Sequence, residues 1–312
     1  MVFEWWLESL GVYIAALVAT AWVTLLERKA LGGAQWRKGP NKVSWKGGLQ
    51  PVADAVKLLT KQTAYPTRSK PFLFLFSPVV SLLLSFCVWH LWPIQTPGHF
   101  YSYGVMLFIC LSSIHVYALI AAGWGSRCQY RVWGAIRGIS LAVRYEIPLV
   151  VFFLSFCVLR ESWDWKMLRT FAASGVPPMM LAWVCFVGCF SLIILEFNRA
   201  PFDLTEAESE LVSGFNTEFG ATGFVLLFLA EYMRILVGTQ LLAIFCVGVM
   251  GITPFLFVGM FFCWVVLISR AAYPRVKLDI VIDSCWKRYM PLSLVLLTLC
   301  VVVFLFYVYV KI

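Results

Sequence analysis

Residues 170–220 have the sequence TFAASGVPPMMLAWVCFVGCFSLIILEFNRAPFDLTEAESELVSGFNTEFG, in which an uncharged run ends in a strongly acidic segment. The run, Thr170 to Leu195, exceeds the roughly 20 residues that an α-helix needs to cross about 30 Å of hydrocarbon. Directly after it, six of the chain's 16 acidic residues fall between Glu196 and Glu218. A carboxylate in hydrocarbon is costly, so this cluster beside a span indicates the use of protons or cations. A solvated, charged loop is the plainer alternative.

The composition indicates a membrane protein before any motif is considered. Hydrophobic residues make up 61% of the chain and charged residues 13%, too few polar groups to cover a water-exposed surface. Two of the uncharged runs are long enough for two spans each, and turn residues at Pro93, Pro97-Gly98, Gly251 and Pro254 divide them. The uncharged runs are residues 9–26, 71–126, 170–195, 235–269 and 289–310.

We therefore predict an all-α polytopic membrane protein that forms one membrane domain over residues 1–312. Eight transmembrane helices are expected, near residues 9–28, 72–92, 100–122, 139–159, 177–195, 220–242, 252–269 and 290–310. In the fourth helix the uncharged part, Ile147–Leu159, reaches only about 20 Å at 1.5 Å per residue. Glu146 is therefore expected within the membrane region, with Arg144 as a nearby partner.

Charge asymmetry predicts the topology, because Lys and Arg accumulate on the side of the membrane that is not translocated. The loop over residues 27–71 carries ten Lys or Arg, loop 123–144 four, the acidic loop 196–219 one and loop 270–289 five. The opposite side has Arg160, Lys166, Arg169 and Lys311. Both termini are therefore expected on the translocated side. The net charge of +9 then reflects membrane topology, and a nucleic-acid partner is not expected.

The sequence lacks the usual motifs for bound cofactors. Its ten cysteines are scattered without a Cys-x-x-Cys spacing, and neither a Gly-x-Gly-x-x-Gly motif nor a phosphate-binding loop occurs. The three histidines, His90, His99 and His115, are isolated along the chain. We expect the chain alone to bind no metal, nucleotide, flavin or iron–sulfur cluster.

A short amphipathic helix is predicted in the first basic loop. Between Leu49 and Lys61 apolar residues recur at helical spacing, and Asp54, Lys57 and Lys61 share the opposite face. Pro51 suits the first turn of a helix. The segment is too short and too charged to span a membrane, so it should lie in the interface with its basic side toward lipid headgroups. A surface anchor and a ligand-lining role fit this pattern about equally.

Two more ionisable residues fall inside a predicted span. Glu231 and Arg234 are three residues apart on one face of the sixth helix, so a buried ion pair that only fixes packing is one interpretation. A functional role is favoured, because charged groups within a membrane usually mark proton or ion pathways.

The acidic loop predicts a short capped helix. Thr205-Glu206-Ala207-Glu208 fits a capping box, and Gly214 would end the helix. Glu206 and Glu210 lie four residues apart, where two like charges favour proton uptake by one of them. An ordinary surface helix and a divalent-cation site are the alternatives, although a calcium loop needs closer Asp, Asn and Gly spacing.

Several long motifs, taken in order, resemble the quinone-proximal membrane subunit of respiratory complex I, the NADH:ubiquinone oxidoreductase chain 1 family. The resemblance covers nearly the whole chain. The motifs are Glu27-Arg28-Lys29 with Leu31-Gly32, Arg37-Lys38-Gly39-Pro40-Asn41, Leu49-Gln50-Pro51-x-Ala53-Asp54-x-x-Lys57-Leu58, the segment from Glu196 to Leu211, Ala230-Glu231-Tyr232 and Arg270-Ala271-x-Tyr273-Pro274-Arg275.

The resemblance implies a proton-pumping enzyme in which this chain forms much of the tunnel for ubiquinone but holds no redox centre. It implies partners among the other complex I subunits, namely iron–sulfur subunits at the quinone site and antiporter-like membrane subunits, together with membrane lipids. The residues it implies for the tunnel are Glu27, Arg28, Arg37, Asp54, Phe202, Arg270 and Arg275. The carboxylates it implies for proton coupling are Glu146, Glu196, Asp203, Glu206, Glu208 and Glu231, with Arg199 and Arg234 as charge partners.

Three departures from the family pattern bear on the site: Ala207 replaces a usual glycine, Phe219 a frequent tyrosine and Gln62 a usual glutamate. Two other functions remain open, a complex-I-like hydrogenase with another electron acceptor and an independent ion transporter or channel. The mitochondrial inner membrane is the expected location, because the compact chain resembles organelle-encoded members. A bacterial plasma membrane is the alternative.

Overall fold

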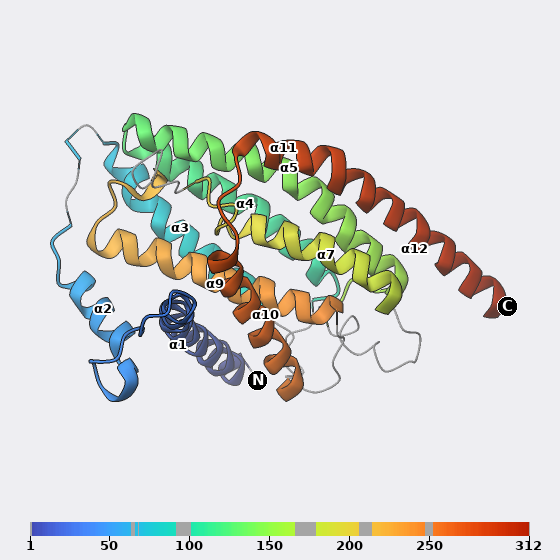
Figure 1. The fold of residues 1–312 in the computed structure, drawn as a ribbon, viewed down its shortest axis with the longest axis horizontal. Coiled ribbons are helices and arrows are strands. Elements are labelled where there is room, and N and C mark those ends of the chain that lie inside the picture. Colours follow the sequence, from blue (N-terminus) through green and yellow to red (C-terminus); the bar gives the residue numbers. More distant parts are fainter. Residues whose placement is uncertain are drawn as a thin grey trace.

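The computed structural model describes residues 2–63, 66–67, 69–91, 101–165, 179–205, 214–246 and 252–311 (Figure 1). Within these residues the long helices are α1 (Val2–Ala34), α3 (Pro71–His90), α4 (Gly104–Gly125), α5 (Gln129–Arg160), α7 (Met179–Glu196), α9 (Ala221–Cys246), α10 (Ile252–Ala272) and α12 (Met290–Lys311). The short helical segments are η1 (Trp45–Gly47), α2 (Gln50–Leu59), η3 (Gly214–Asn216), α11 (Leu278–Ser284) and the π-helical turn η4 (Cys285–Tyr289).

The long helices confirm the predicted all-α polytopic membrane class. Across the described ranges, seven helices are long and apolar enough to cross a membrane, and Val187–Glu196 of α7 is a shorter apolar stretch. A long helix lies at each of the eight predicted positions, but the count of eight spans stays a prediction. The expected short helix after Thr205 lies outside the described residues.

Three helices extend by more than four residues beyond their predicted bounds. Helix α1 begins at Val2 and ends at Ala34, α5 begins at Gln129 instead of near residue 139, and α11 continues through η4 into α12. The early part of α5 belongs to the predicted basic loop 123–144. Charge limits how deeply a segment can enter hydrocarbon, but arginine is a good helix former, so the helix continues beyond the span.

Helix α9 lies at the centre of the packing. It contacts α3, α10, α1, α7 and α2, while α5 packs between α4 and α12. Met233, Ile235 and Leu242 of α9 are almost completely buried. Figure 1 shows α12 running past the other helices, so that its C-terminal end projects away from the bundle.

The segments predicted to face the inside meet at one end of the bundle. Three hydrogen bonds join them: Lys70 N to Gly125 O at 2.7 Å, Val276 N to Pro201 O at 3.0 Å, and Arg131 Nε to Phe215 O at 2.5 Å. The contacts therefore place most of the Lys and Arg residues at this end, as the charge asymmetry predicts. The side of the membrane that this end faces stays a prediction.

Arg131 is a buried cation that the sequence analysis did not single out. Its side chain is fully buried, and its guanidinium lies 3.8 Å from the ring centroid of Phe219 and 5.2 Å from that of Phe74. A cation over aromatic faces is stabilised where water is excluded. Phe219, which lacks the hydroxyl of the family's frequent tyrosine, thus contributes its ring face to this contact.

The close packing of α5 against the acidic segment predicts a specific sensitivity at Gly134. A Cβ atom there would lie 3.0 Å from Phe215 N and 3.1 Å from Thr205 O, both backbone atoms, whereas a Cβ at Gly11 of α1 meets nothing within 4 Å. Gly134→Ala should therefore destabilise the protein by about 1–3 kcal/mol through overpacking. Gly11→Ala should be neutral or stabilise it slightly, since alanine is the better helix former.

Thermal unfolding of the two purified variants beside the unchanged protein measures this difference. A melting temperature for Gly134→Ala equal to that of Gly11→Ala would show that α5 does not pack tightly on this segment.

Candidate functional site

A buried carboxylate, Glu27, lies where three helices meet, near the end of the bundle that carries most of the Lys and Arg residues. Glu27 comes from α1 and is 3% exposed. The Tyr232 hydroxyl of α9 donates a hydrogen bond to its Oε2 atom, and Arg270 of α10 forms an ion pair with Oε1. Because an unpaired buried charge is strongly destabilising, these contacts hold the three helices in one arrangement.

Arg199 extends this network to a second carboxylate. Its Nη1 atom lies 4.0 Å from Glu27 Oε1, and its Nη2 atom lies 3.5 Å from Glu231 Oε2. The guanidinium also lies over the Tyr232 ring, 4.6 Å from its centroid. Two carboxylates and two guanidinium groups thus balance in charge. We call Glu27, Arg199, Glu231, Tyr232 and Arg270 the Glu27 cluster.

A cavity of about 620 Å³ opens beside the Glu27 cluster. Its charged wall includes Glu27, Arg199 and Arg270, and its apolar wall includes Phe224 and Phe228 of α9. The remaining lining residues are Thr20, Ala21, Thr24, Arg28, Leu31, Pro51, Asp54, Ala55, Leu58, Asn216, Val225, Leu229 and Tyr232. A cavity of this size with one polar and one apolar side suits a small amphiphilic organic molecule.

Helix α2 forms the outer wall of the cavity and differs from its predicted orientation. Asp54 was placed on the headgroup side with Lys57, but it faces inward, accepting from Arg28 Nη1 at 2.5 Å and from Gln50 Nε2 at 3.0 Å. The apolar face carrying Val52 and Val56 is the exposed one. The hydrophobic stripe of α2 did not show which side of this helix packs on the protein, because a short helix can place either its polar or its apolar side against α1.

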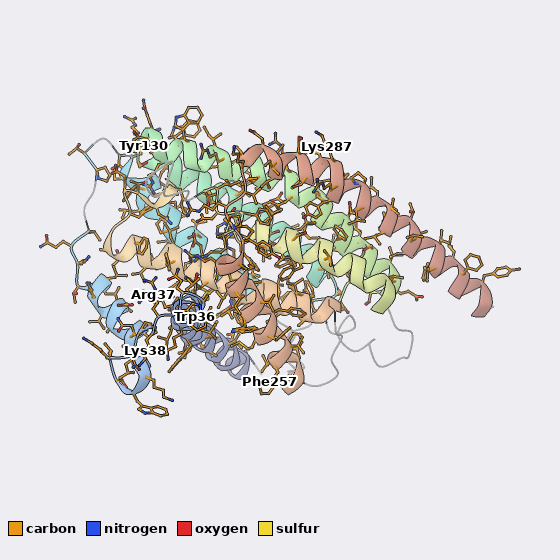
Figure 2. All side chains as sticks on the ribbon, in the orientation of Figure 1. Trp36, Arg37, Lys38, Tyr130, Phe257 and Lys287 are labelled. Carbon is orange, nitrogen blue, oxygen red and sulfur yellow. The ribbon has the colours of Figure 1, made fainter. Side chains whose placement is uncertain are left out.

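The predicted tunnel residues divide into two groups. Glu27, Arg28, Asp54 and Arg270 line the cavity, whereas the other three, Arg37, Phe202 and Arg275, are absent from its described lining. Arg37 is exposed on the connection that follows α1 (Figure 2), Phe202 packs against the hydrophobic core, and Arg275 Nη2 binds Asp203 Oδ2 at 3.0 Å.

The predicted coupling carboxylates are also partly brought together. Glu231 belongs to the Glu27 cluster. Glu196, the last residue of α7, and Asp203, which follows it in the chain, are both buried. Glu146 of α5 is half-buried, and its Oε1 atom has no hydrogen-bond partner in the described part of the chain. The two remaining coupling carboxylates, Glu206 and Glu208, lie outside the described residues, as does Glu210.

The charge partners were predicted only in part. Glu231 pairs with Arg199, the partner that the family resemblance implies for the coupling carboxylates, whereas the Arg234 guanidinium contacts His115 Nδ1 at 3.2 Å. No ion pair joins Arg144 to Glu146 in the described residues. Spacing along one helix can bring two charges to the same face, but partners on neighbouring helices compete for them.

Tyr232 and His115 were not recognised as site residues from the sequence. Tyr232 is adjacent to Glu231 within a quoted motif, so the motif was a usable signal for it. His115 is isolated along the chain, so its spacing gave no signal for the contact with Arg234, which lies 119 residues later.

Comparison with known proteins gives consistent matches along the chain. The model of the NADH dehydrogenase family matches residues 7–301. NADH-ubiquinone oxidoreductase chain 1 of Artemia franciscana is 41% identical over 91% of this chain and 94% of its own length. The proteins of the same name from Heterololigo bleekeri and Aedes aegypti are 39% and 38% identical, covering 93% and 92% of this chain and 94% and 91% of their own lengths.

The burial of the Glu27 cluster predicts a large stability effect at Glu27. Glu27→Gln removes the charge that balances Arg270 and Arg199, and we expect a loss of about 3 kcal/mol, the lower end for breaking a buried ion pair. Asp283→Asn is the matched control, because its i,i+4 pair with Lys287 is exposed and should contribute less than about 0.5 kcal/mol.

Thermal and denaturant unfolding of both variants measure these losses. If Glu27→Gln is no less stable than Asp283→Asn, the Glu27 cluster does not hold α1, α9 and α10 together.

Proposed function

We propose, because the chain belongs to the NADH dehydrogenase family, that it is the quinone-proximal membrane subunit of an NADH:ubiquinone oxidoreductase. The observation that carries this proposal is the cavity beside the Glu27 cluster, within a chain that matches the family over nearly its full length. The chain acts as a subunit without a redox centre of its own. A neighbouring iron–sulfur subunit supplies the electrons for quinone reduction.

The two walls of the cavity suit the two parts of a quinone. The carbonyl oxygens of the headgroup accept hydrogen bonds, and Arg270 and Arg199 are permanent donors at the charged wall. The isoprenoid tail is apolar and gains by leaving water for the wall of Phe224, Phe228 and Leu229. We infer that the headgroup lies toward Glu27 and that the tail runs along α9.

Arg199 connects the quinone cavity to the coupling carboxylates. It lines the cavity and contacts both Glu27 and Glu231, so a change of charge at a reduced headgroup reaches Glu231 through one side chain. We infer that the change continues along Glu196, Glu146 and the loop carboxylates Asp203, Glu206 and Glu208 toward the antiporter-like subunits. In this mechanism quinone reduction alters the protonation or ordering of residues 196–219.

A complex-I-like hydrogenase and an independent transporter are the other assignments. Native purification in mild detergent, with mass spectrometry of the co-purifying chains and an inhibitor-sensitive NADH:quinone assay, separates them. Flavin and iron–sulfur subunits together with that activity support our proposal, whereas hydrogenase subunits or a lone ion-conducting oligomer contradict it. Fractionation of the source cells tests the proposed mitochondrial inner membrane against a bacterial plasma membrane.

The quinone proposal predicts that filling the cavity impairs quinone use. Ala55 of α2 lines the cavity, while Ala53, two residues earlier, is exposed on the other side of the helix. Ala55→Phe should raise the KM for a long-tailed ubiquinone about tenfold, the effect of losing about 1.4 kcal/mol of binding. Ala53→Phe adds the same bulk outside and should leave KM unchanged.

NADH:quinone assays on the assembled complexes measure both KM values. Equal values for the two variants would place the quinone elsewhere.

The coupling proposal predicts a loss of turnover when Glu231 cannot ionise. Glu231→Gln keeps the size of the side chain but removes the charge beside Arg199, and we expect quinone reductase activity and proton pumping to fall about tenfold or more. Asp279→Asn, on an exposed position of α11, is the control and should keep both activities. Pumping measured in proteoliposomes at the unchanged rate for Glu231→Gln would remove this carboxylate from the pathway.

A further inference from the structure

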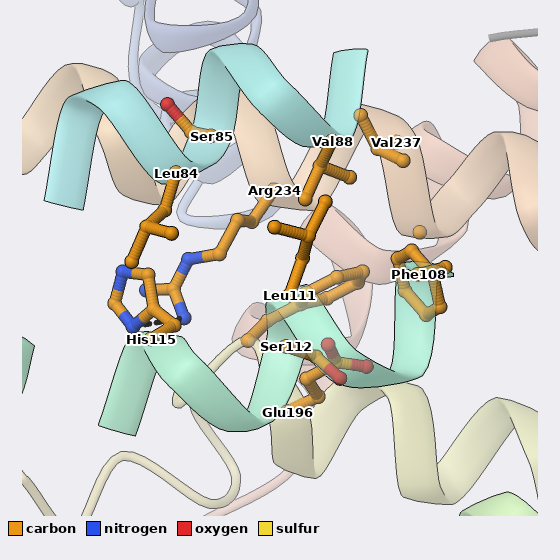
Figure 3. Close-up of a pocket in the computed structure, with 12 residues that line it drawn as sticks. Leu84, Ser85, Val88, Phe108, Leu111, Ser112, His115, Glu196, Arg234 and Val237 are labelled. Carbon is orange, nitrogen blue, oxygen red and sulfur yellow. Dashed lines mark hydrogen bonds between the residues drawn. The ribbon is translucent and has the colours of Figure 1, made fainter. Parts of the chain in front are cut away.

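A second, much smaller cavity lies deeper in the bundle, between α3, α4, α9 and the end of α7 (Figure 3). Its volume is about 20 Å³, which holds one water molecule but no larger ligand. The polar side chains in its wall are Ser85, Ser112, His115, Glu196 and Arg234. The rest of its wall is apolar, with Leu84, Val88, Phe108, Leu111, Phe197, Val237 and Gly238.

The contact between Arg234 and His115 defines the hydrogen positions on the histidine. A guanidinium group can only donate hydrogen bonds, so His115 Nδ1, 3.2 Å from Arg234 Nη1, must be the acceptor. His115 is therefore neutral and carries its proton on Nε2. This arrangement orients Arg234 without neutralising its charge, because the partner is a neutral ring and not a carboxylate.

Arg234, one of the residues that line the small cavity, still has an unpaired donor. Its Nε atom is buried and has no hydrogen-bond partner in the described part of the chain. A buried donor left unpaired is costly, and ordered water is the usual partner for such groups.

Glu196 supplies the complementary charge from another helix. It is 8% exposed and lines the same cavity, yet it forms no ion pair within 4.0 Å of Arg234 in the described residues. Figure 3 shows the Arg234 and Glu196 side chains on separate helices among the residues that line the cavity, with the Arg234 guanidinium beside His115. The two residues thus line one cavity that can hold a water molecule, without a direct ion pair between them in the described residues.

We propose that this small cavity is a water-binding site in which one water molecule bridges the Arg234 guanidinium and the Glu196 carboxylate, while His115 holds Arg234 in position. The water accepts a hydrogen bond from Arg234 and donates one to Glu196. A carboxylate bonded to water can exchange a proton with it, whereas a carboxylate locked in a direct ion pair cannot do so without breaking that pair. His115 and Arg234 are positioning residues for the proton step at Glu196. The inference rests on the proposed coupling role of Glu196.

Variants at His115 separate positioning from packing. His115→Leu removes the acceptor for Arg234, and His115→Gln retains one. We expect His115→Leu to slow proton pumping by the assembled enzyme about tenfold, the effect of losing one hydrogen bond to a charged group. His115→Gln should restore most of the rate. Equal rates for the two variants would overturn the positioning role.

Ser113→Ala provides a control on the same helix outside the cavity wall. The Ser113 hydroxyl donates to the Cys110 carbonyl at 3.0 Å, so its loss should leave pumping unchanged. If Ser113→Ala slows pumping as much as His115→Leu does, any change in this part of α4 is harmful and the assigned roles of His115 and Arg234 fall.

Glu196→Gln distinguishes failure of this inference from failure of the proposed function. Normal pumping by Glu196→Gln would remove the coupling role itself. Impaired Glu196→Gln with normal His115→Leu and Arg234→Met would overturn the water site alone. A high-resolution electron cryo-microscopy map of the assembled enzyme tests the site independently of activity. We expect density for one water within hydrogen-bond distance of both side chains, and a direct Arg234–Glu196 ion pair would contradict the proposal.

Discussion

The carboxylate of Glu27 cannot lie in an apolar bundle without partners, and this constraint organises the polar end of the molecule. The free-energy cost of taking a charge out of water is offset only by close opposite charges and hydrogen bonds. For Glu27 these come from Tyr232, Arg270 and Arg199. Those partners come from α9, α10 and the segment after α7. The same residues form the charged wall of the large cavity, so the contacts that hold the helices together also create the candidate quinone site.

Charge compensation is shared between the proposed quinone site and the proposed proton path. Arg199 contacts Glu27 at the cavity and Glu231 within the bundle, so neither carboxylate can change its charge without affecting the other. Deeper in the bundle Arg234 has a neutral partner in His115. The ion pairs of Glu27 and Glu231 thus lie beside the cavity, whereas Glu196 forms no direct ion pair with Arg234 in the described residues.

Sequence patterns predicted the membrane class, the positions of the long helices and the depth of Glu231 and Arg234. They did not predict the partner of Arg234, whereas Arg199 as the partner of Glu231 came from the family resemblance. Ion pairs between helices depend on how each helix is rotated about its axis, and α9 is apolar on nearly every face, so its periodicity contains little information about that rotation. Arg131 was overlooked for a related reason: its stabilising contacts, Phe74 and Phe219, are far away in sequence.

The most direct test of this account is the position of a bound quinone in the assembled enzyme. An electron cryo-microscopy map with a tight-binding quinone-site inhibitor or a ubiquinone analogue should show ligand density in the cavity between α1, α2 and α9. We expect its headgroup beside Glu27, Arg199 or Arg270 and its tail along Phe224 and Phe228. Density at a site that this chain does not line, with this cavity filled by lipid or side chains, would contradict the account.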